Sequence, residues 1–285
     1  MAHQPIDKNV FAGSEVTVTR VGLGGEGVLR THGEGDRARK VIRAALAEGI
    51  TYFDSARVYA DSELYYGALW GMVPETRRMV FQTSKSTRRD KKGAREDLEA
   101  SLQRLQTDRL DLWQIHDVRT ADDVARISDP GGALEAFTDA KAAGSVRFIG
   151  VTGHQNPAVL TQAVQNWPVD AVMLPVNPVE GVLGGFLTET LPAARQRGLA
   201  TIAMKVLGGS HFLHTESGAG AGMLVRYALS FPVTVVIVGC ASPEEVRCLA
   251  DAARNPTPLS AGERQGLENL YAPYAKHLAF YRVSD

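Results

Sequence analysis

Three acid-base residues each end a short apolar segment, and they recur at a constant interval. Asp54 ends TYFD, Lys85 ends VFQTSK and His116 ends LWQIH, and 31 residues separate each from the next. That interval is about the length of one strand, one helix and the return to the next strand. In a barrel built from such units, the C-terminal ends of the strands meet at one face. The spacing therefore predicts an active site where three distant polar groups converge.

A nearby tyrosine completes a set that could transfer a proton. Tyr59 lies in DSARVY, shortly after Asp54. A phenol has a pKa near 10, so it is a poor proton donor at neutral pH unless a neighbouring cation stabilises its anion. We expect Lys85 to supply that cation, Asp54 to hold the ammonium, and His116 to orient a carbonyl oxygen or share its proton. Tyr59 is then the predicted general acid.

Each of these residues alone has a simpler interpretation. A tyrosine in a loop usually packs, an aspartate after a strand is often a cap, and a lone lysine is usually solvated. Charges at buried strand ends are different, because an unpaired charge there costs several kcal/mol and requires a partner. Together with the equal spacing, this favours the catalytic interpretation.

Helix and strand signals alternate along the whole chain, without a linker that would mark a domain boundary. A hairpin is expected from about Val10 to Val18, then a first barrel strand over residues 19–23 and a helix from Asp36 that stops at Gly49. A capping box of Ser260 and Glu263 predicts a final helix. The further strands are ITYFD, VFQTSK, LDLWQI, VRFIGV, DAVMLPV, LATIAMKV and VTVVIVG.

Eight nearly continuous apolar strands that alternate with helices are typical of parallel strands buried on both faces. The predicted fold is therefore α/β, a (β/α)8 TIM barrel with an N-terminal β-hairpin and an extra C-terminal helix. Residues 1–285 are expected to form one domain.

A competing interpretation is a dinucleotide-binding fingerprint. Gly22, Gly24 and Gly27 form G-x-G-x-x-G after the first expected strand, and Asp54 ends the next one. The fingerprint requires a helix to open at the third glycine, but here the helix begins only at Asp36. The glycines are instead expected to let a ligand approach the rim of the barrel.

Composition narrows the class of partner. The 285 residues carry 31 Lys and Arg against 32 Asp and Glu, a net charge of −1, so neither nucleic acid nor an anionic membrane is an expected partner. Cys240 and Cys248 fit a reducing compartment, and no metal-binding spacing is present. The first residues, MAHQPIDKNV, lack the apolar stretch of a signal peptide, and no apolar run reaches membrane-spanning length. We expect a cytoplasmic protein that acts on a small molecule.

At these motifs the chain resembles the aldo-keto reductases. Asp54, Tyr59, Lys85 and His116 lie in FDSA, Y-x-x-SE, TSK and IH, which are similar to that family's signatures. The resemblance covers nearly the whole length. It implies a barrel that binds NADPH or NADH without a Rossmann fold, and hydride transfer to an aldehyde or ketone while Tyr59 protonates the oxygen. The reverse reaction would oxidise an alcohol.

The resemblance also implies a cofactor site, with departures from the better-known members. Thr152 and Gly153 replace a Ser and an Asn, Met173 replaces a frequent Gln, and Met204 replaces a stacking aromatic, although a thioether can cover a ring face. A glycine-rich loop suits backbone contacts to a pyrophosphate. The implied cofactor-binding residues are Gly24, Gly25, Asp54, Thr152, Gly153, Met173, Met204, Lys205, Leu207, Gly208, Gly209, Gly239, Ser242 and Glu245.

The expected cofactor is NADP(H), with NAD(H) as the alternative. Gly239 and Glu245 stand where many NADPH-dependent members carry cations, and a carboxylate would repel a 2′-phosphate but accept hydrogen bonds from the ribose of NAD. A simpler interpretation is that Ser242, Pro243 and Glu245 only open a helix.

The residues expected at the rim predict a polar or sugar-like carbonyl or hydroxyl substrate. Glu26 replaces an aromatic often found at the pocket, and four polar residues lie on neighbouring rim segments, although surface charges on loops are common. Two other functions stay open: a Schiff-base aldolase that uses Lys85, and a nucleotide-binding redox sensor with little turnover. The four rim residues are Arg57, Asp117, Arg119 and His154.

Overall fold

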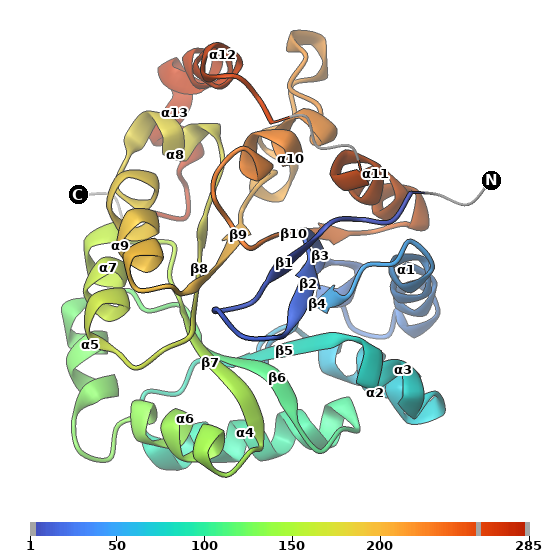
Figure 1. Ribbon diagram of the computed structural model, residues 1–285, viewed down its shortest axis with the longest axis vertical. Helices are drawn as coiled ribbons and strands as arrows, with labels where there is room; N and C mark the ends of the chain where they lie inside the picture. Colours follow the sequence, from blue (N-terminus) through green and yellow to red (C-terminus); the bar gives the residue numbers. More distant parts are fainter. Residues whose placement is uncertain (1–3, 255–257, 283–285) are drawn as a thin grey trace.

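The computed structural model describes residues 4–254 and 258–282. Eight parallel strands form a closed barrel in the order β10-β3-β4-β5-β6-β7-β8-β9, and β10 closes the ring by pairing with β3 (Figure 1). This confirms the predicted (β/α)8 fold. The strands are β3 (Val21–Gly27), β4 (Tyr52–Phe53), β5 (Phe81–Ser86), β6 (Leu110–Ile115), β7 (Val146–Thr152), β8 (Ala171–Pro175), β9 (Ala200–Met204) and β10 (Val235–Cys240).

Helices surround the barrel, and the first of them ends as predicted. Gly49 follows it with a positive φ, as Gly144 and Gly198 follow two other helices, and Ser260 and Glu263 form the expected capping box of α12. The short helices α3, α5, α8 and α13 were not predicted. The helices are α1 (Gly35–Ala47), α2 (Ser62–Met72), α3 (Pro74–Met79), α4 (Lys91–Leu105), α5 (Ala121–Ser128), α6 (Ala133–Ala142), α7 (Pro157–Asn166), α8 (Pro178–Leu183), α9 (Leu191–Gln196), α10 (Ala221–Leu229), α11 (Pro243–Arg254), α12 (Ala261–Tyr271) and α13 (Ala275–Leu278).

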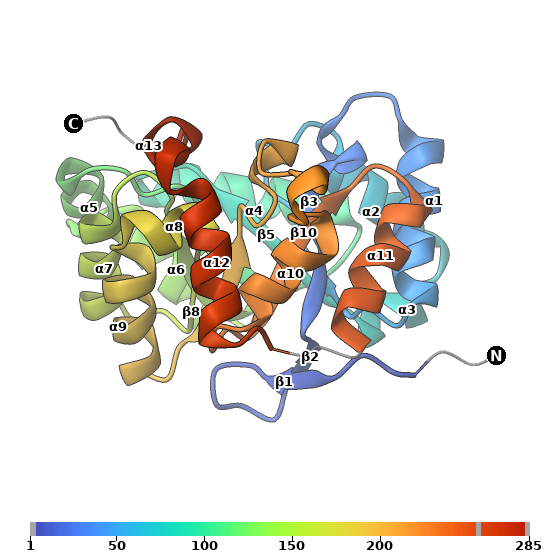
Figure 2. The same ribbon diagram turned by 90° about the horizontal axis from the view of Figure 1, so that it is seen from above.

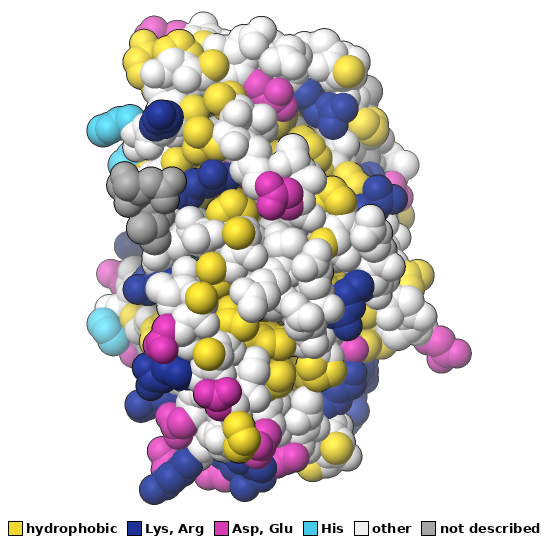
Figure 3. Space-filling model, turned by 90° about the vertical axis from the view of Figure 1, so that its left-hand side faces the viewer, with side chains coloured by type: hydrophobic (Ala, Val, Ile, Leu, Met, Phe, Trp, Pro, Cys, Tyr) yellow, Lys and Arg dark blue, Asp and Glu magenta, His cyan; other side chains and the backbone are white. Residues whose placement is uncertain are grey.

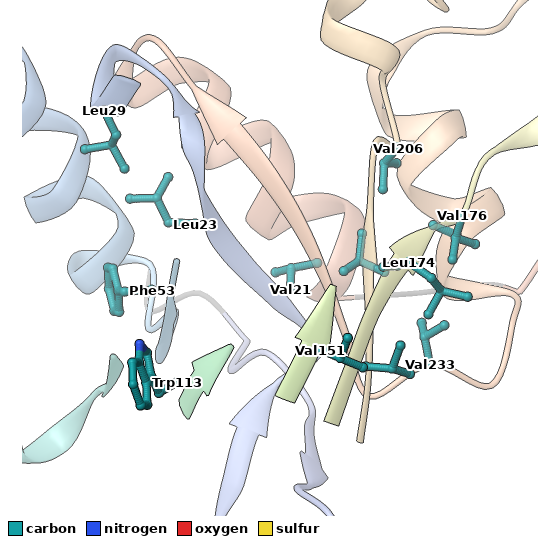
Figure 4. Close-up of a cluster of buried hydrophobic side chains, with 14 of the residues drawn as sticks. Val21, Leu23, Leu29, Phe53, Trp113, Val151, Leu174, Val176, Val206 and Val233 are labelled. Atoms are coloured by element: carbon teal, nitrogen blue, oxygen red, sulfur yellow. The ribbon is translucent and has the colours of Figure 1, made fainter. Parts of the chain in front are cut away.

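Two apolar clusters hold the barrel together, one on each side of its wall. The larger cluster lies between strands and helices and includes Leu23, Phe53, Trp113 and Leu174 (Figure 4). The smaller cluster includes Phe81, Leu112, Phe148 and Ile202, which alternate along their strands with residues of the larger cluster. A strand buried on both faces needs apolar residues at successive positions, which explains the continuous apolar segments of the sequence.

The predicted N-terminal hairpin closes one end of the barrel. Strands β1 (Lys8–Val10) and β2 (Thr17–Thr19) are antiparallel, and the connection between them carries Phe11. The ring of Phe11 is fully buried, with its centroid 4.6 Å from that of Phe81 and 5.0 Å from that of Phe148. In Figure 2 the hairpin and α13 lie at opposite ends of the barrel.

The first barrel strand differs from its prediction. The sequence predicted a strand over residues 19–23, but β3 runs from Val21 to Gly27, so the G-x-G-x-x-G glycines lie inside the strand. Neighbouring protein atoms account for them: an added Cβ would lie 2.7 Å from the ring of Tyr52 at Gly22 and 2.8 Å from a backbone amide at Gly24. Glycine has no apolar side chain, so the glycine-rich part of β3 lacked the apolar pattern of a strand. This explains why the strand was predicted to end too early.

The described residues contain no helix long and apolar enough to cross a membrane. Within the same residues, no group of three His, Cys, Asp or Glu side chains is arranged to hold a metal ion. On the face drawn in Figure 3, acidic and basic side chains lie interspersed. The expectation that nucleic acid is not a partner stays a prediction.

Candidate active site

A buried ion pair stands at the C-terminal ends of β4 and β5. Nζ of Lys85 donates to both carboxylate oxygens of Asp54 at 2.7 Å and to the carbonyl oxygen of Ser55 at 2.8 Å. The hydroxyl of Thr83 donates to the same carboxylate at 2.9 Å. Burial lowers the pKa of Lys85, and the carboxylate of Asp54 acts in the opposite direction. Three acceptors therefore engage the three protons of the ammonium.

The ring of Tyr59 lies between the ion pair and His116. Nζ of Lys85 is 4.8 Å from the centroid of the tyrosine ring, and the rings of Tyr59 and His116 are 5.5 Å apart at 81°. An added Cβ at Gly25 would lie 2.6 Å from the tyrosine ring, so glycine makes room for it. Asp54, Lys85 and His116 thus meet at one place, as their spacing predicted, and Tyr59 lies beside them. Their catalytic roles stay predictions.

The pKa of Tyr59 lies above its ordinary value, which differs from what we expected. Burial raises the pKa of Tyr59, and so do the carboxylates of Asp54 and Glu26. The guanidinium of Arg30 lowers it, with its central carbon 5.0 Å from the ring centroid. Burial of the ring is the largest cause of the difference, and the carboxylate of Asp54, which pairs with Lys85, adds to it. The phenol therefore carries its proton at neutral pH.

His116 is held through its backbone and is uncharged at neutral pH. Its amide donates to the carbonyl of Ser86 at 2.8 Å, and its carbonyl accepts from Arg89 at 2.8 Å. Burial lowers the pKa of His116 well below its ordinary value, and the ammonium of Lys85 adds to this effect. Within the described residues, neither Nδ1 of His116 nor the buried side-chain amide of Gln114 has a hydrogen-bond partner.

A buried glutamate fixes the loop that carries Tyr59. Glu63 accepts hydrogen bonds from Arg57 at 2.8 Å, Ser84 at 2.7 Å and Arg104 at 3.0 Å. Arg104 also donates to the carbonyl of Ala60 at 2.8 Å, and Ala60 has the positive φ of 45° that is uncommon for a residue with a side chain. These contacts attach the loop to β5 and α4.

A polar cluster follows His116 at the rim. Asp117 has a φ of 55°, and its carboxylate contacts Arg119 at 2.6 Å and Nε2 of His154 at 3.0 Å. Burial acts to raise the pKa of Asp117, but the contacts with His154 and Arg119 outweigh it and hold the pKa well below its usual range. The backbone amide of Asp117 donates to the hydroxyl of Thr152 at 2.8 Å. The rim is polar, as predicted.

The residues predicted to bind the cofactor lie on or directly after β3, β4, β7, β8, β9 and β10, at one end of the barrel. Several already contact other protein groups: Met173 packs in the barrel interior, and an added Cβ at Gly239 would lie 2.6 Å from Glu26. Gly209 and Ser210 are exposed and have positive φ. The structure places these residues around the same mouth as Tyr59, while their cofactor contacts stay a prediction.

Sequence reasoning missed three residues at the mouth. Arg30 follows the first barrel strand, whereas Asn177 and Tyr281 come from distant parts of the chain. Asn177 donates to the hydroxyl of Tyr281 at 3.1 Å and to the carbonyl of Lys205 at 3.1 Å. The tyrosine also donates to the buried Glu180 at 2.8 Å. Asn177 lies two residues after the end of β8, and that position was the available signal.

Comparisons with known proteins agree with this geometry. The sequence model of the Aldo/keto reductase family matches residues 20–223. The chain is 28% identical over 209 residues to an aldo-keto reductase of Strobilurus tenacellus, covering 67% of this chain and 59% of the relative. It is 29% identical over 197 residues to the 6-dehydroglucose reductase of Novosphingobium aromaticivorans, covering 63% and 62%. It therefore spans about three fifths of the length of these relatives.

A solved structure has the same fold. An aldo-keto reductase from Klebsiella pneumoniae, solved in complex with NADPH, superposes with a TM-score of 0.74 at 23% sequence identity. The match covers 95% of this chain and 96% of that one.

Proposed function

Because this chain belongs to the aldo/keto reductase family, we propose that it is an NADP(H)-dependent oxidoreductase that reduces the carbonyl group of a small polar substrate, or catalyses the reverse oxidation. One observation carries the proposal: Tyr59 lies against both Lys85 and His116. The hydroxyl of Tyr59 makes no hydrogen bond to another described residue, so it is free to meet a substrate oxygen.

The proton chemistry falls to the protein, because a bound nicotinamide would supply only the hydride. Tyr59 donates its hydroxyl proton to the carbonyl oxygen as negative charge develops there. The raised pKa of Tyr59 keeps the phenol protonated until then. The ammonium of Lys85 acts on the phenolate that remains only through its charge, since its protons are bonded to Asp54 and Ser55, and the carboxylate of Asp54 offsets part of that charge. The neutral imidazole of His116 orients the carbonyl oxygen.

The mouth fits a dinucleotide in two respects. Met204 is half-buried at the end of β9, where its thioether can cover a ring face. After it, Gly209 has a φ of 62° and only a distant ring atom near the position of a Cβ, so the backbone is open to a pyrophosphate. Gly209 and Leu207 would hold that group through backbone amides, whereas the amide of Gly208 already donates to the carbonyl of Lys205 at 3.1 Å.

The choice of NADP(H) over NAD(H) depends on the start of α11. Glu245 accepts a hydrogen bond from the amide of Ala241 at 2.7 Å, and its own amide donates to Ser242 at 3.3 Å. These contacts support the interpretation of Glu245 as a helix cap, which leaves it less free to bind a ribose. We therefore keep NADP(H), with NAD(H) as the alternative.

The substrate we propose is a small hydroxylated aldehyde or ketone, such as a sugar. The mouth presents the ion pair of Arg30 with Glu26, at 2.7 Å, and that of Arg119 with Asp117. One relative of this chain is named 6-dehydroglucose reductase. Polar groups at a site favour substrates that satisfy their hydrogen bonds.

Two alternatives have less support. A Schiff-base aldolase needs a lysine with a free, accessible amine, whereas Lys85 is fully buried and hydrogen-bonded at three acceptors. A redox sensor would not need the acid-base set at all.

A cytoplasmic location also remains our proposal, and both cysteines are free, as a reducing compartment requires.

The test is oxidation of NADPH with glyoxals, simple aldehydes and aldoses, for the wild type and Tyr59→Phe. We expect the substitution to lower kcat by at least about a hundredfold, the range for removing a general acid, with little change in the Kd of NADPH. An unchanged kcat would exclude Tyr59 as the acid. A negligible wild-type rate would favour the sensor. A preference for NADH above tenfold in kcat/KM would replace the cofactor assignment.

A further inference from the structure

Lys205 stands at the mouth without a counter-ion. It directly follows β9, it is half-buried, and its ammonium has no ion-pair partner in the part of the chain that the structure describes. Nζ lies 5.9 Å from the centroid of the Tyr281 ring. Burial lowers the pKa of Lys205, while the nearby carboxylate of Glu26 opposes this. A half-buried charge without a partner is unusual in a folded protein.

The backbone holds this lysine in an uncommon conformation. Lys205 has a φ of 57°, and the side chain of Asn177 fixes its carbonyl at 3.1 Å. Asn177 is fully buried, and its carbonyl oxygen caps α8 by accepting from the amide of Glu180 at 3.0 Å. Residues with side chains that are held at positive φ cluster at functional sites. The position of Lys205 is therefore imposed by its neighbours.

The other cations around the mouth are paired. Arg30 contacts Glu26 at 2.7 Å, Arg119 contacts Asp117 at 2.6 Å, and Lys85 contacts Asp54 at 2.7 Å. Each of these pairs is close to neutral as a unit. Lys205 therefore adds one positive charge that the described groups of the mouth do not neutralise by direct contact.

A series of ring and ion contacts leads from Lys205 toward the reacting residues. Its ammonium faces the ring of Tyr281, whose centroid lies 6.1 Å from that of His154. Nε2 of His154 lies 3.0 Å from Asp117, the residue after His116. Lys205 is thus connected, through Tyr281 and His154, to the rim segment that follows His116.

We propose that Lys205 binds an acidic group of the substrate, so that the preferred substrates are aldehydes or ketones that also carry a carboxylate or a phosphate. This inference rests on the proposed function and narrows its substrate class. An ammonium in a partly desolvated site forms strong, charge-assisted hydrogen bonds with such oxygens. The family resemblance implied Lys205 as a cofactor-binding residue, and the pyrophosphate of a dinucleotide offers the same oxygens, so the experiment separates the two sources.

The experiment compares substrates that differ in one acidic group. Succinic semialdehyde is paired with butanal, and glyceraldehyde 3-phosphate with glyceraldehyde, for the wild type, Lys205→Met and Lys205→Arg. We expect Lys205→Met to lower kcat/KM for one acidic substrate at least tenfold more than for its neutral partner, mainly through KM. Lys205→Arg should retain most of the preference. Lys40→Met, an exposed lysine on α1, is the matched control and should change nothing.

Two readouts decide against the inference. If Lys205→Met raises the Kd of NADPH tenfold and slows acidic and neutral substrates equally, the lysine serves the dinucleotide and the inference is overturned. The same holds if no substrate is affected. Calorimetric titration with succinate, an unreactive dicarboxylate, is independent of turnover: binding that Lys205→Met abolishes supports the inference even if the wild type reduces no aldehyde, and no binding to the wild type contradicts it.

Discussion

The two ends of the barrel interior differ in chemistry although the same strands build both. At the N-terminal end, Phe11 from the hairpin packs against Phe81 and Phe148. Four residues after Phe81, on the same face of β5, Lys85 pairs with Asp54. One strand thus contributes first to an apolar plug and then to a charged site. We infer that the first end mainly stabilises the fold, while the second carries the chemistry at a cost in stability.

The largest expected effect comes from breaking the ion pair. Lys85→Met leaves the carboxylate of Asp54 buried without its partner, so we expect it to lower the free energy of unfolding by about 3–5 kcal/mol. It should also lower kcat by about a hundredfold or more, because the phenolate of Tyr59 loses its nearby cation. Urea unfolding and turnover with a simple aldehyde measure the two effects.

A double variant separates these two losses. Asp54→Asn combined with Lys85→Met removes both charges, and we expect most of the lost stability to return while kcat stays low. If kcat recovered together with stability, the lysine would have only a structural role.

A substitution at the N-terminal end of the barrel should lower stability without lowering kcat. Phe11→Ala removes a fully buried ring from the plug, and we expect a loss of about 3–5 kcal/mol in the free energy of unfolding. The kcat of the folded protein should not change, because the ring lies at the far end of the barrel from Tyr59. A fall in kcat comparable to that of Lys85→Met would mean that the two ends are not independent. Thermal unfolding and turnover at a temperature where both proteins are folded test this.

The smallest expected effect is the dependence of stability on pH at His116. Its pKa is lowered in the folded state, so below the ordinary pKa of about 6.5 the unfolded chain binds more protons. The contribution of the uncharged imidazole to the free energy of unfolding is therefore fully present at neutral pH. It decreases as the pH falls below about 6.5, by at most about 1.4 kcal/mol per pH unit. Urea unfolding between pH 5 and 8 should show a shallower dependence for His116→Gln than for the wild type.

His214→Gln, at an exposed position, serves as the control for this measurement and should keep the wild-type dependence. Equal slopes for the wild type and His116→Gln would mean that the imidazole is as easily protonated in the folded protein as in the unfolded chain.

The sequence predicted the eight strands and the meeting of four residues because both depend on local patterns. Apolar segments identify buried strands, and parallel strands of a barrel direct their C-terminal ends to one face. The glycines of β3 gave no such pattern, because their requirement arises from neighbours on other strands, such as Tyr52 beside Gly22 and Tyr59 beside Gly25. That one domain spans residues 1–285 stays a prediction.

Contacts between distant segments could not be predicted in the same way. The packing of Phe11 against Phe148 and the hydrogen bond between Asn177 and Tyr281 join residues more than a hundred positions apart. The direction of the pKa shift of Tyr59 also depends on three-dimensional burial, which residue types do not reveal. The sequence thus indicated which groups meet, but not the environment that tunes them.

Six described residues other than glycine have positive φ, and three of them directly follow a residue predicted to belong to the site: Ala60 after Tyr59, Asp117 after His116 and Lys205 after Met204. Hydrogen bonds to the carbonyls of Ala60 and Lys205 and to the amide of Asp117 hold these kinks in place. The loops around the mouth therefore have little freedom left to lose when a ligand arrives. Ligand binding should then cost little conformational entropy, because the binding site is preorganised.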